Sequence, residues 1–200
     1  MKVLVALGIV LSLAIWIKYM RLSRIQNPGA EMPRPSKLLA FISVVFDRIF
    51  IFISVGFAIL FLMLGYPDMF LPFSCHLDLP LQLIGLALSF TGTFLSWWAI
   101  ASFGEFNEPR YIRLKQEHKI VKTGAYRYIR HPQYASKMLV YLGPFLFFKD
   151  FLFILIFLSS MLLFFFQAKS EEKLLIQVFG DEYKSYQATS SMFFPLIHSR

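Results

Sequence analysis

The sequence predicts an all-α integral membrane protein with five transmembrane helices, the last two forming a helical hairpin, and a cytoplasmic C-terminal cap. Of its 200 residues, 57% are apolar and only 16% are charged, a balance that does not suit a water-exposed surface. Several uncharged runs have the length of a membrane crossing. Basic residues gather in two of the segments between these runs, as expected of cytoplasmic loops.

Four of the spans are predicted by long uncharged runs, which cover residues 3–17, 49–67, 79–103 and 151–168. With its flanks, each approaches the roughly 20 residues that a helix needs to cross a hydrocarbon core about 30 Å thick. The first run also has the form of a signal peptide, but no small-x-small cleavage site follows it, which favours a retained helix. The expected spans are residues 3–20, 41–66, 80–102, 135–148 and 151–170.

The span at 135–148 is predicted from the turn that follows it. One continuous helix over 138–168 would be about 46 Å long, at about 1.5 Å per residue, and would overshoot the bilayer. Lys149 and Asp150 supply the polar residues of a turn between two helices. We therefore expect a helical hairpin whose first arm is short and bent at Pro144.

Charge placement predicts the orientation of a single membrane domain over residues 1–200. Segments 18–37 and 104–133 are rich in lysine and arginine, whereas 66–78 contains two aspartates and no basic residue. By the positive-inside rule the basic segments are cytoplasmic, so the N-terminus lies outside. Segments 104–134 and 171–200 then share the cytoplasmic face. The net charge of +8 is explained by this topology and by contact with the membrane surface, not by nucleic acid binding.

Two polar clusters are the candidate functional segments. They are KTGAYRYIRHPQY, at 122–134, and EEKLLIQVFGDEYKSYQ, at 171–187. Pro132 biases His131 toward an extended conformation, so the residues around it are expected to form a polar turn. The second cluster has the apolar spacing of an amphipathic helix, which Gly180 would end or bend. The predicted hairpin brings the two clusters to the same face.

Both clusters also have simpler interpretations. Arg127 and Arg130 suit a role as snorkelling membrane anchors. The neighbouring tyrosines suit an interfacial aromatic belt. Adjacent acids such as Glu171 and Glu172 are costly at the end of an apolar helix unless they are solvated or paired, and a basic cluster is expected nearby.

The order of these motifs resembles the C-terminal half of the isoprenylcysteine carboxyl methyltransferase family, and more widely the integral-membrane phospholipid methyltransferases. The resemblance covers about 115–197 and departs from the family pattern at Ala125, where proline is usual. It implies S-adenosylmethionine as the cofactor, held near the membrane surface. The cofactor-binding residues that it implies are Gly124, Tyr126, Arg130, His131, Pro132, Tyr134, Glu171 and Glu172.

The chemistry of this cofactor suits the residues present. Arg130 would hold its carboxylate, Glu171 or Glu172 its ammonium group, and tyrosine faces its sulfonium. His131 would donate to the carboxylate or orient the acceptor. These two residues and the two acids are therefore the predicted catalytic residues. A carboxylate acceptor needs no general base, whereas an amine acceptor would lose a proton to one of the acids or to His131.

The sequence thus predicts a methyltransferase whose acceptor enters laterally from the bilayer. The first choice of acceptor is the carboxylate of a prenylated cysteine, and the alternative is a phospholipid with an amine headgroup. A non-catalytic scaffold that binds anionic lipid is the alternative of another class. No metal is expected, because His118 and His131 lack a ligand spacing. Glu105 and Glu108 are either acceptor-side contacts or solvated loop acids.

Overall fold

The computed structural model describes residues 37–64, 79–103 and 120–195. Their elements are α2 (Lys37–Leu64), α3 (Leu79–Phe103), the 3₁₀ turn η2 (Gly124–Arg127), α4 (Pro132–Phe148), α5 (Phe151–Phe179) and α6 (Asp181–Thr189). The predicted all-α class is confirmed for this part of the chain. The span expected at 3–20 lies outside the described residues.

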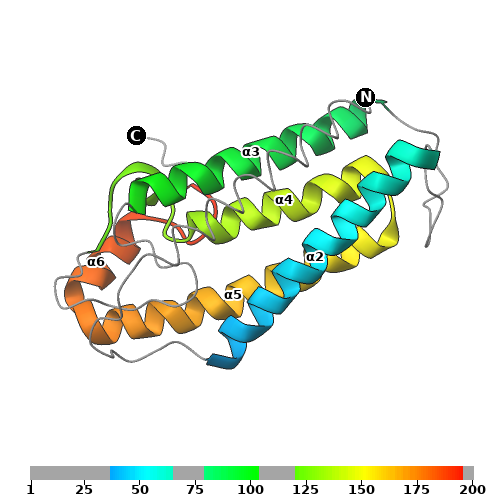
Figure 1. Cartoon of the computed structure of the whole chain (residues 1–200). Coiled ribbons are helices and arrows are strands. Elements are labelled where there is room, and N and C mark those ends of the chain that lie inside the picture. The colour runs from blue at the N-terminus through cyan, green and yellow to red at the C-terminus, as the bar shows by residue number, and fades with distance from the viewer. Residues whose placement is uncertain (1–36, 65–78, 104–119, 196–200) are drawn as a thin grey trace.

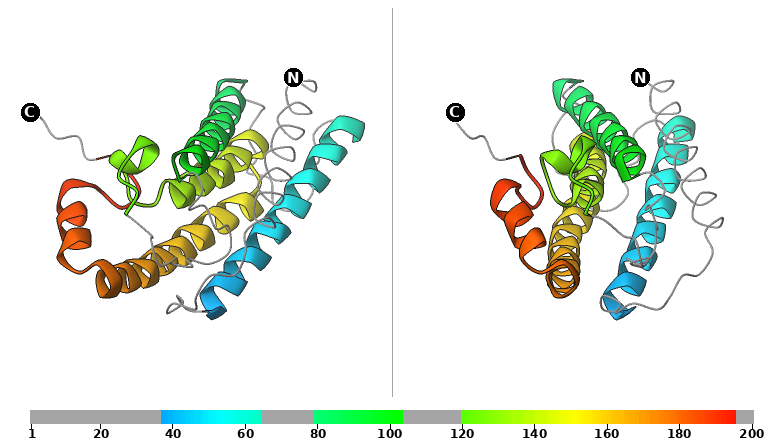
Figure 2. Two further views of the ribbon diagram at one scale, coloured as in Figure 1. Left: turned by 60° about the vertical axis from the view of Figure 1, so that its left-hand side comes forward. Right: turned by 90° about the vertical axis from the view of Figure 1, so that its left-hand side faces the viewer.

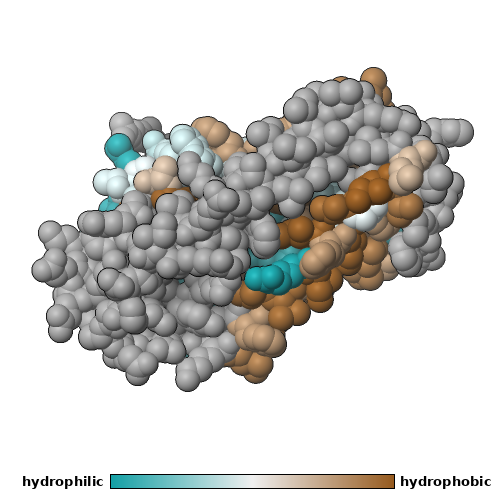
Figure 3. All heavy atoms as spheres, in the orientation of Figure 1, coloured by the Kyte–Doolittle hydropathy of each residue, from teal (hydrophilic) through white to brown (hydrophobic). Residues whose placement is uncertain are grey.

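Long helices run side by side, and the shorter elements gather at one end of them (Figures 1 and 2). Within the described ranges, two helices are long and apolar enough to cross a membrane, over Leu79–Ser102 and Phe151–Phe179. Their outer faces carry large exposed apolar side chains, as does α2, whose flank is largely hydrophobic in Figure 3. Such broad apolar exposure suits a lipid environment. The five crossings and the transmembrane hairpin remain predictions.

Helices α3 and α4 pack backbone to backbone along a seam of small residues. A Cβ atom added to Gly85 would lie 2.6 Å from the carbonyl oxygen of Gly143, and one added to Gly92 would lie 2.7 Å from that of Ser136. The paired positions run in opposite directions along the two helices, so the helices are antiparallel. Small residues let helices approach closely where no hydrophobic effect drives them together, as in lipid. We call these four residues the glycine seam.

Helices α4 and α5 are joined by the two residues at which a turn was expected. Lys149 is left-handed, with φ 53° and ψ 32°, and the Asp150 side chain accepts a hydrogen bond from the Leu152 backbone N–H at 2.8 Å. An aspartate in this position caps the first turn of a helix. Pro144 lies inside α4, as predicted from the sequence.

One boundary of α4 and one of α5 differ from those expected, and α2 also begins earlier, at Lys37 rather than at 41. Helix α4 begins at Pro132 and not at 135, because proline suits the first helical position, where its missing N–H has no intrahelical partner. The polar stretch before it is therefore not a single turn. Helix α5 continues past 170 to Phe179 without a break, and Gly180, with φ 55°, ends it. Both acids at 171 and 172 consequently lie on the same rigid helix as the apolar segment.

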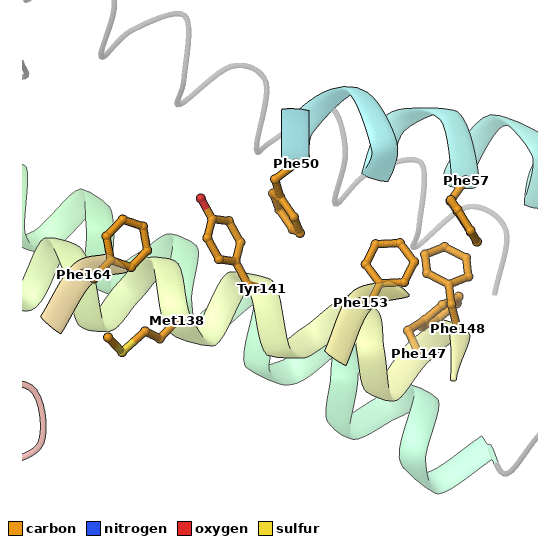
Figure 4. Close-up of a cluster of buried hydrophobic side chains, with 8 residues drawn as sticks. All are labelled: Phe50, Phe57, Met138, Tyr141, Phe147, Phe148, Phe153 and Phe164. Carbon is orange, nitrogen blue, oxygen red and sulfur yellow. The ribbon is translucent and has the colours of Figure 1, made fainter. Parts of the chain in front are cut away.

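Helix α2 contacts α4 and α5 through aromatic rings. Phe50 lies 4.0 Å from Tyr141 between ring centroids, and Phe57 lies 4.9 Å from Phe153 (Figure 4). Aromatic pairs at such separations favour tilted and edge-to-face arrangements, which are observed here. These rings belong to a buried apolar cluster that extends along α4 and α5 from Phe148 and Phe153 to Phe164.

Candidate functional site

The candidate site forms where three segments far apart in sequence meet, next to α6 (Figure 1). The chain after α6 crosses the start of α4, where the Arg130 N–H donates to the Ser191 carbonyl at 2.8 Å and the His131 N–H to the Met192 carbonyl at 3.1 Å. The second half of α5 lies against the same residues. The two polar clusters of the sequence are thus side by side, as predicted.

Four of the predicted site residues form one buried group, which we call the charge cluster: Arg130, His131, Glu171 and Glu172. Arg130 Nε donates to Glu172 Oε1 at 2.7 Å. The His131 ring lies between the acids, with Nδ1 3.5 Å from Glu171 Oε2 and Nε2 3.4 Å from Glu172 Oε1. No side chain in the cluster is more than 11% exposed. The adjacent acids are therefore paired with cations, which offsets the cost of burying them.

Arg130 also anchors the chain that follows α6. Its Nη1 donates to the Gln187 carbonyl at 3.1 Å and to the Ser190 carbonyl, while Gln187 Nε2 donates to Glu172 Oε2 at 3.0 Å. Within the described residues, the remaining guanidinium nitrogen, Nη2, has no hydrogen-bond partner. Sequence reasoning considered Arg130 as a cofactor ligand or as a membrane anchor, and it did not predict that Arg130 holds the chain after α6.

An aromatic stack continues from the charge cluster toward the apolar part of α5. The Tyr134 ring is stacked against His131 at 5.6 Å and against Phe164 at 5.2 Å, and its hydroxyl donates to Glu171 Oε1. Tyr134 thus fixes the carboxylate of Glu171 and carries a flat face beside it. Electron-rich faces next to a carboxylate can stabilise a bound cation.

The surroundings of His131 favour its charged form. Burial alone would lower the pKa of its imidazole, but hydrogen bonds and charge attraction from Glu171 and Glu172 outweigh it and raise the pKa above 6.5. An imidazolium donates from both ring nitrogens, which matches one acid on each side of the ring. When His131 is protonated, the charge cluster contains two cations and two anions.

This raised pKa predicts a pH dependence of stability. Because the folded-state pKa exceeds the unfolded one, the stabilisation from proton binding is complete below pH 6.5 and is lost as pH rises through the folded-state pKa. In detergent, the melting temperature should fall as the pH rises above about 6.5. The slope should be shallower in His131→Gln. Parallel curves for the two proteins would show that His131 does not carry the effect.

Gly124 and Tyr126 position the start of α4 against α3 and α6. Gly124 has φ +57°, and a Cβ atom there would lie 2.7 Å from the Cβ of Ser102. The Ser102 hydroxyl accepts the Ala125 backbone N–H at 3.2 Å. The Tyr126 carbonyl accepts the Tyr186 hydroxyl at 2.5 Å. These two residues, predicted as cofactor contacts, therefore have structural roles that support the site.

Gly124→Ala is expected to destabilise the protein for two separate reasons. Left-handed backbone costs a residue with a Cβ roughly 1–2 kcal/mol, and overpacking adds typically about 1–3 kcal/mol. The melting temperature in detergent should fall clearly. Gly56→Ala in α2 is the matched control, since a Cβ atom there meets nothing within 4 Å. Alanine in this helix interior should be neutral or stabilising, and equal losses in both variants would contradict the steric explanation.

The sequence reasoning missed an ion pair between α2 and α4. Lys137 Nζ lies 2.5 Å from Asp47 Oδ2, and the Tyr141 hydroxyl donates to Asp47 Oδ1, so a carboxylate of α2 is tied to α4. The signal was available, because Asp47 lies within the apolar segment 41–66 and ionised residues in such segments need partners. Lys137 Nζ also lies 5.1 Å from the Phe164 ring centroid.

The other candidates can be placed only in part. Pro132, at the first position of α4, is fully buried beside the charge cluster. Glu105, Glu108 and His118 lie outside the described residues. Among the residues that the structure does describe, no group of histidine, cysteine and acidic side chains has the arrangement of a metal site.

Comparison with known proteins places this arrangement in a family. A family model described as phospholipid methyltransferase matches residues 81–182, just over half of the chain. The chain belongs to the phospholipid methyltransferase family. The resemblance predicted from the sequence is thereby confirmed. The phospholipid methyltransferase match runs from α3 to the beginning of α6 and includes the whole charge cluster.

A curated relative narrows the comparison within the phospholipid methyltransferase family. The chain is 31% identical over 108 residues to the protein-S-isoprenylcysteine O-methyltransferase of Schizosaccharomyces pombe. The aligned part is 53% of this chain and 46% of that relative, so the chain spans about half the length of the relative.

Proposed function

We propose that the protein is an S-adenosylmethionine-dependent methyltransferase that methylates a membrane-embedded acceptor, with the carboxylate of a prenylated cysteine as the first choice. The observation that carries the proposal is the charge cluster. Its residues come from the start of α4 and from α5, and all of them lie within the family match. The name of the fission yeast relative favours this acceptor.

The charge cluster fits the amino-acid end of the cofactor. That end is a zwitterion, and the cluster presents both signs of charge in a buried setting, where such pairing is strong. Arg130 Nη2 would hold the carboxylate, and the His131 imidazolium, whose two ring nitrogens face Glu171 and Glu172, would add its positive charge nearby. Glu171, fixed by Tyr134, would hold the ammonium group. When bound, S-adenosylmethionine supplies a methyl group on a positively charged sulfur, which the Tyr134 face would stabilise.

The remaining work of the chain is alignment and exclusion of water. In-line transfer of the methyl group would require Arg130 and Glu171, which would hold the cofactor, to keep it aligned with the acceptor. An acceptor carboxylate is already ionised at neutral pH, and no residue needs to remove a proton. Burial of the cluster against Phe164 and Phe193 keeps competing water away.

A phospholipid with an amine headgroup is the second candidate acceptor, favoured by the description of the family model. An amine needs a general base, and Glu171 is placed to serve. The proposal is tested with purified protein in detergent. It should bind S-adenosylhomocysteine in calorimetry and transfer labelled methyl from S-adenosylmethionine to N-acetyl-S-farnesyl-L-cysteine. A well-folded protein without cofactor binding would instead support the anionic-lipid scaffold.

The proposed orientation places the N-terminus outside and the site on the cytoplasmic face, where the basic segments lie. In a Cys75→Ser background, single cysteines introduced as Phe70→Cys, Lys115→Cys and Ala188→Cys should react with an impermeant thiol reagent from outside only at 70. Ala188 is exposed on α6, so a cysteine there is available to the reagent. Labelling of 115 and 188 from opposite sides would contradict the hairpin topology.

A further inference from the structure

Gln167 is a buried side chain for which the proposed cofactor chemistry has no use. It lies on α5, is 9% exposed, and its Oε1 has no hydrogen-bond partner in the part of the chain that the structure describes. A buried amide oxygen without a partner is unfavourable for the folded protein. Keeping such a group lowers the stability of the folded protein, which points to a ligand that forms the missing hydrogen bond.

The position of Gln167 along α5 indicates the kind of ligand that would contact it. Spacing along α5 places it on the same helical face as Phe164 and Glu171, three residues after the first and four before the second. It is about 6 Å along the helix axis from Glu171, on the side of the apolar segment. Gln167 therefore lies between the charge cluster, proposed to hold the cofactor, and the aromatic core.

An acceptor arriving from the bilayer must place its polar head at this boundary, with its hydrocarbon chain still among apolar side chains. A neutral amide suits the place, because it carries both a donor and an acceptor and adds no charge to the apolar segment. We propose that Gln167 binds the head group of the methyl acceptor, accepting from a nitrogen-bound hydrogen with Oε1 and donating to a neighbouring anionic oxygen with Nε2.

That head-group chemistry, an N–H beside an anionic oxygen, has two sources. A prenylated cysteine presents its amide N–H next to its carboxylate, and an ethanolamine phospholipid presents its ammonium near a phosphate. The inference rests on the proposed function and deepens it by naming an acceptor-side residue. Gln167 is a binding residue in this role, and it takes no part in proton transfer.

The experiment compares Gln167→Leu and Gln167→Glu with wild type in detergent, with Gln177→Leu as a matched control at an exposed position of the same helix. Three quantities are measured: the melting temperature, the affinity for S-adenosylhomocysteine, and kcat/KM for N-acetyl-S-farnesyl-L-cysteine and for dioleoylphosphatidylethanolamine. Gln167→Leu should keep its melting temperature and cofactor affinity. Its kcat/KM should fall about 10- to 150-fold, the value of one hydrogen bond to a charged group.

Gln167→Glu distinguishes the two sources. If the wild type methylates the farnesylated cysteine, the added negative charge should lower that transfer further than Gln167→Leu does. If the wild type methylates the ethanolamine lipid, the added charge should preserve the transfer. Unchanged acceptor kinetics in Gln167→Leu with intact cofactor binding would overturn the acceptor role alone, as would a loss of cofactor affinity in that variant. Absence of cofactor binding in wild type would overturn the proposed function and this inference together.

Discussion

Replacing both Glu171 and Glu172 with glutamine is expected to abolish measurable binding of S-adenosylhomocysteine. The double change removes both anions from the charge cluster, leaving no carboxylate in it to pair with the ligand ammonium group. Each lost charge-assisted hydrogen bond is worth about 1.5–3 kcal/mol, or about 10- to 150-fold in affinity. Calorimetry with protein whose folding is verified by size-exclusion chromatography measures the loss.

The single variants separate cofactor binding from folding. Glu172→Gln leaves Arg130 without its ion-pair partner in a buried place, which typically costs about 3–5 kcal/mol, so it should mainly lower the melting temperature. Glu171→Gln should mainly weaken binding of the ligand. Glu182→Gln is the control, because Glu182 pairs with Lys122 at the exposed surface, where ion pairs contribute little. Full ligand affinity in a folded Glu171→Gln variant would exclude Glu171 from the site.

Arg130→Lys is expected to weaken S-adenosylhomocysteine binding about 10- to 150-fold, the cost of one charge-assisted hydrogen bond. Lysine keeps the positive charge but not the planar fork that donates to Glu172 and to two backbone carbonyls at once. The chain after α6 should loosen as well, because Arg130 holds it. Hydrogen exchange at residues 187–192 should therefore accelerate in the variant.

Arg127→Lys provides the internal comparison, since Arg127 is exposed at the end of η2 and lies outside the charge cluster. It should retain cofactor affinity and normal exchange rates. Membrane insertion should be normal in both variants, because the charge that sets topology is kept. If Arg130→Lys binds the ligand as wild type does and exchanges no faster, Arg130 is not a site residue.

Hydropathy predicted the helical segments, because these depend on local sequence. The residues of the charge cluster were identified by the resemblance of two motifs to the family pattern. The turn at Lys149 and Asp150 was also predictable from local sequence. The start of α4 at Pro132 was not. The rule for residues before proline located a boundary near His131, but the helix begins directly at the proline.

The sequence predicted that the two polar clusters meet, but the individual atoms that pair over long range could not be predicted from it. Arg130 bonds to carbonyl oxygens of residues 187 and 190, and carbonyl groups leave no signature in a side-chain pattern. Asp47 and Lys137 lie far apart in sequence, so their pairing follows from how α2 packs and not from any motif. Gln167 became notable only when its burial and missing partner were known.

The glycine seam restricts which residues can occupy its positions in related proteins. Gly85, Gly92 and Gly143 each face backbone or a short serine side chain at distances that no larger residue can occupy, so only coordinated changes on both helices would be accepted. In family members that share this helix pair, we expect glycine at these positions even where the lipid-facing residues of the same helices differ freely. A set of relatives with leucine or phenylalanine there would contradict this. The short distance between α3 and α4 thus depends on three positions that have no side chain.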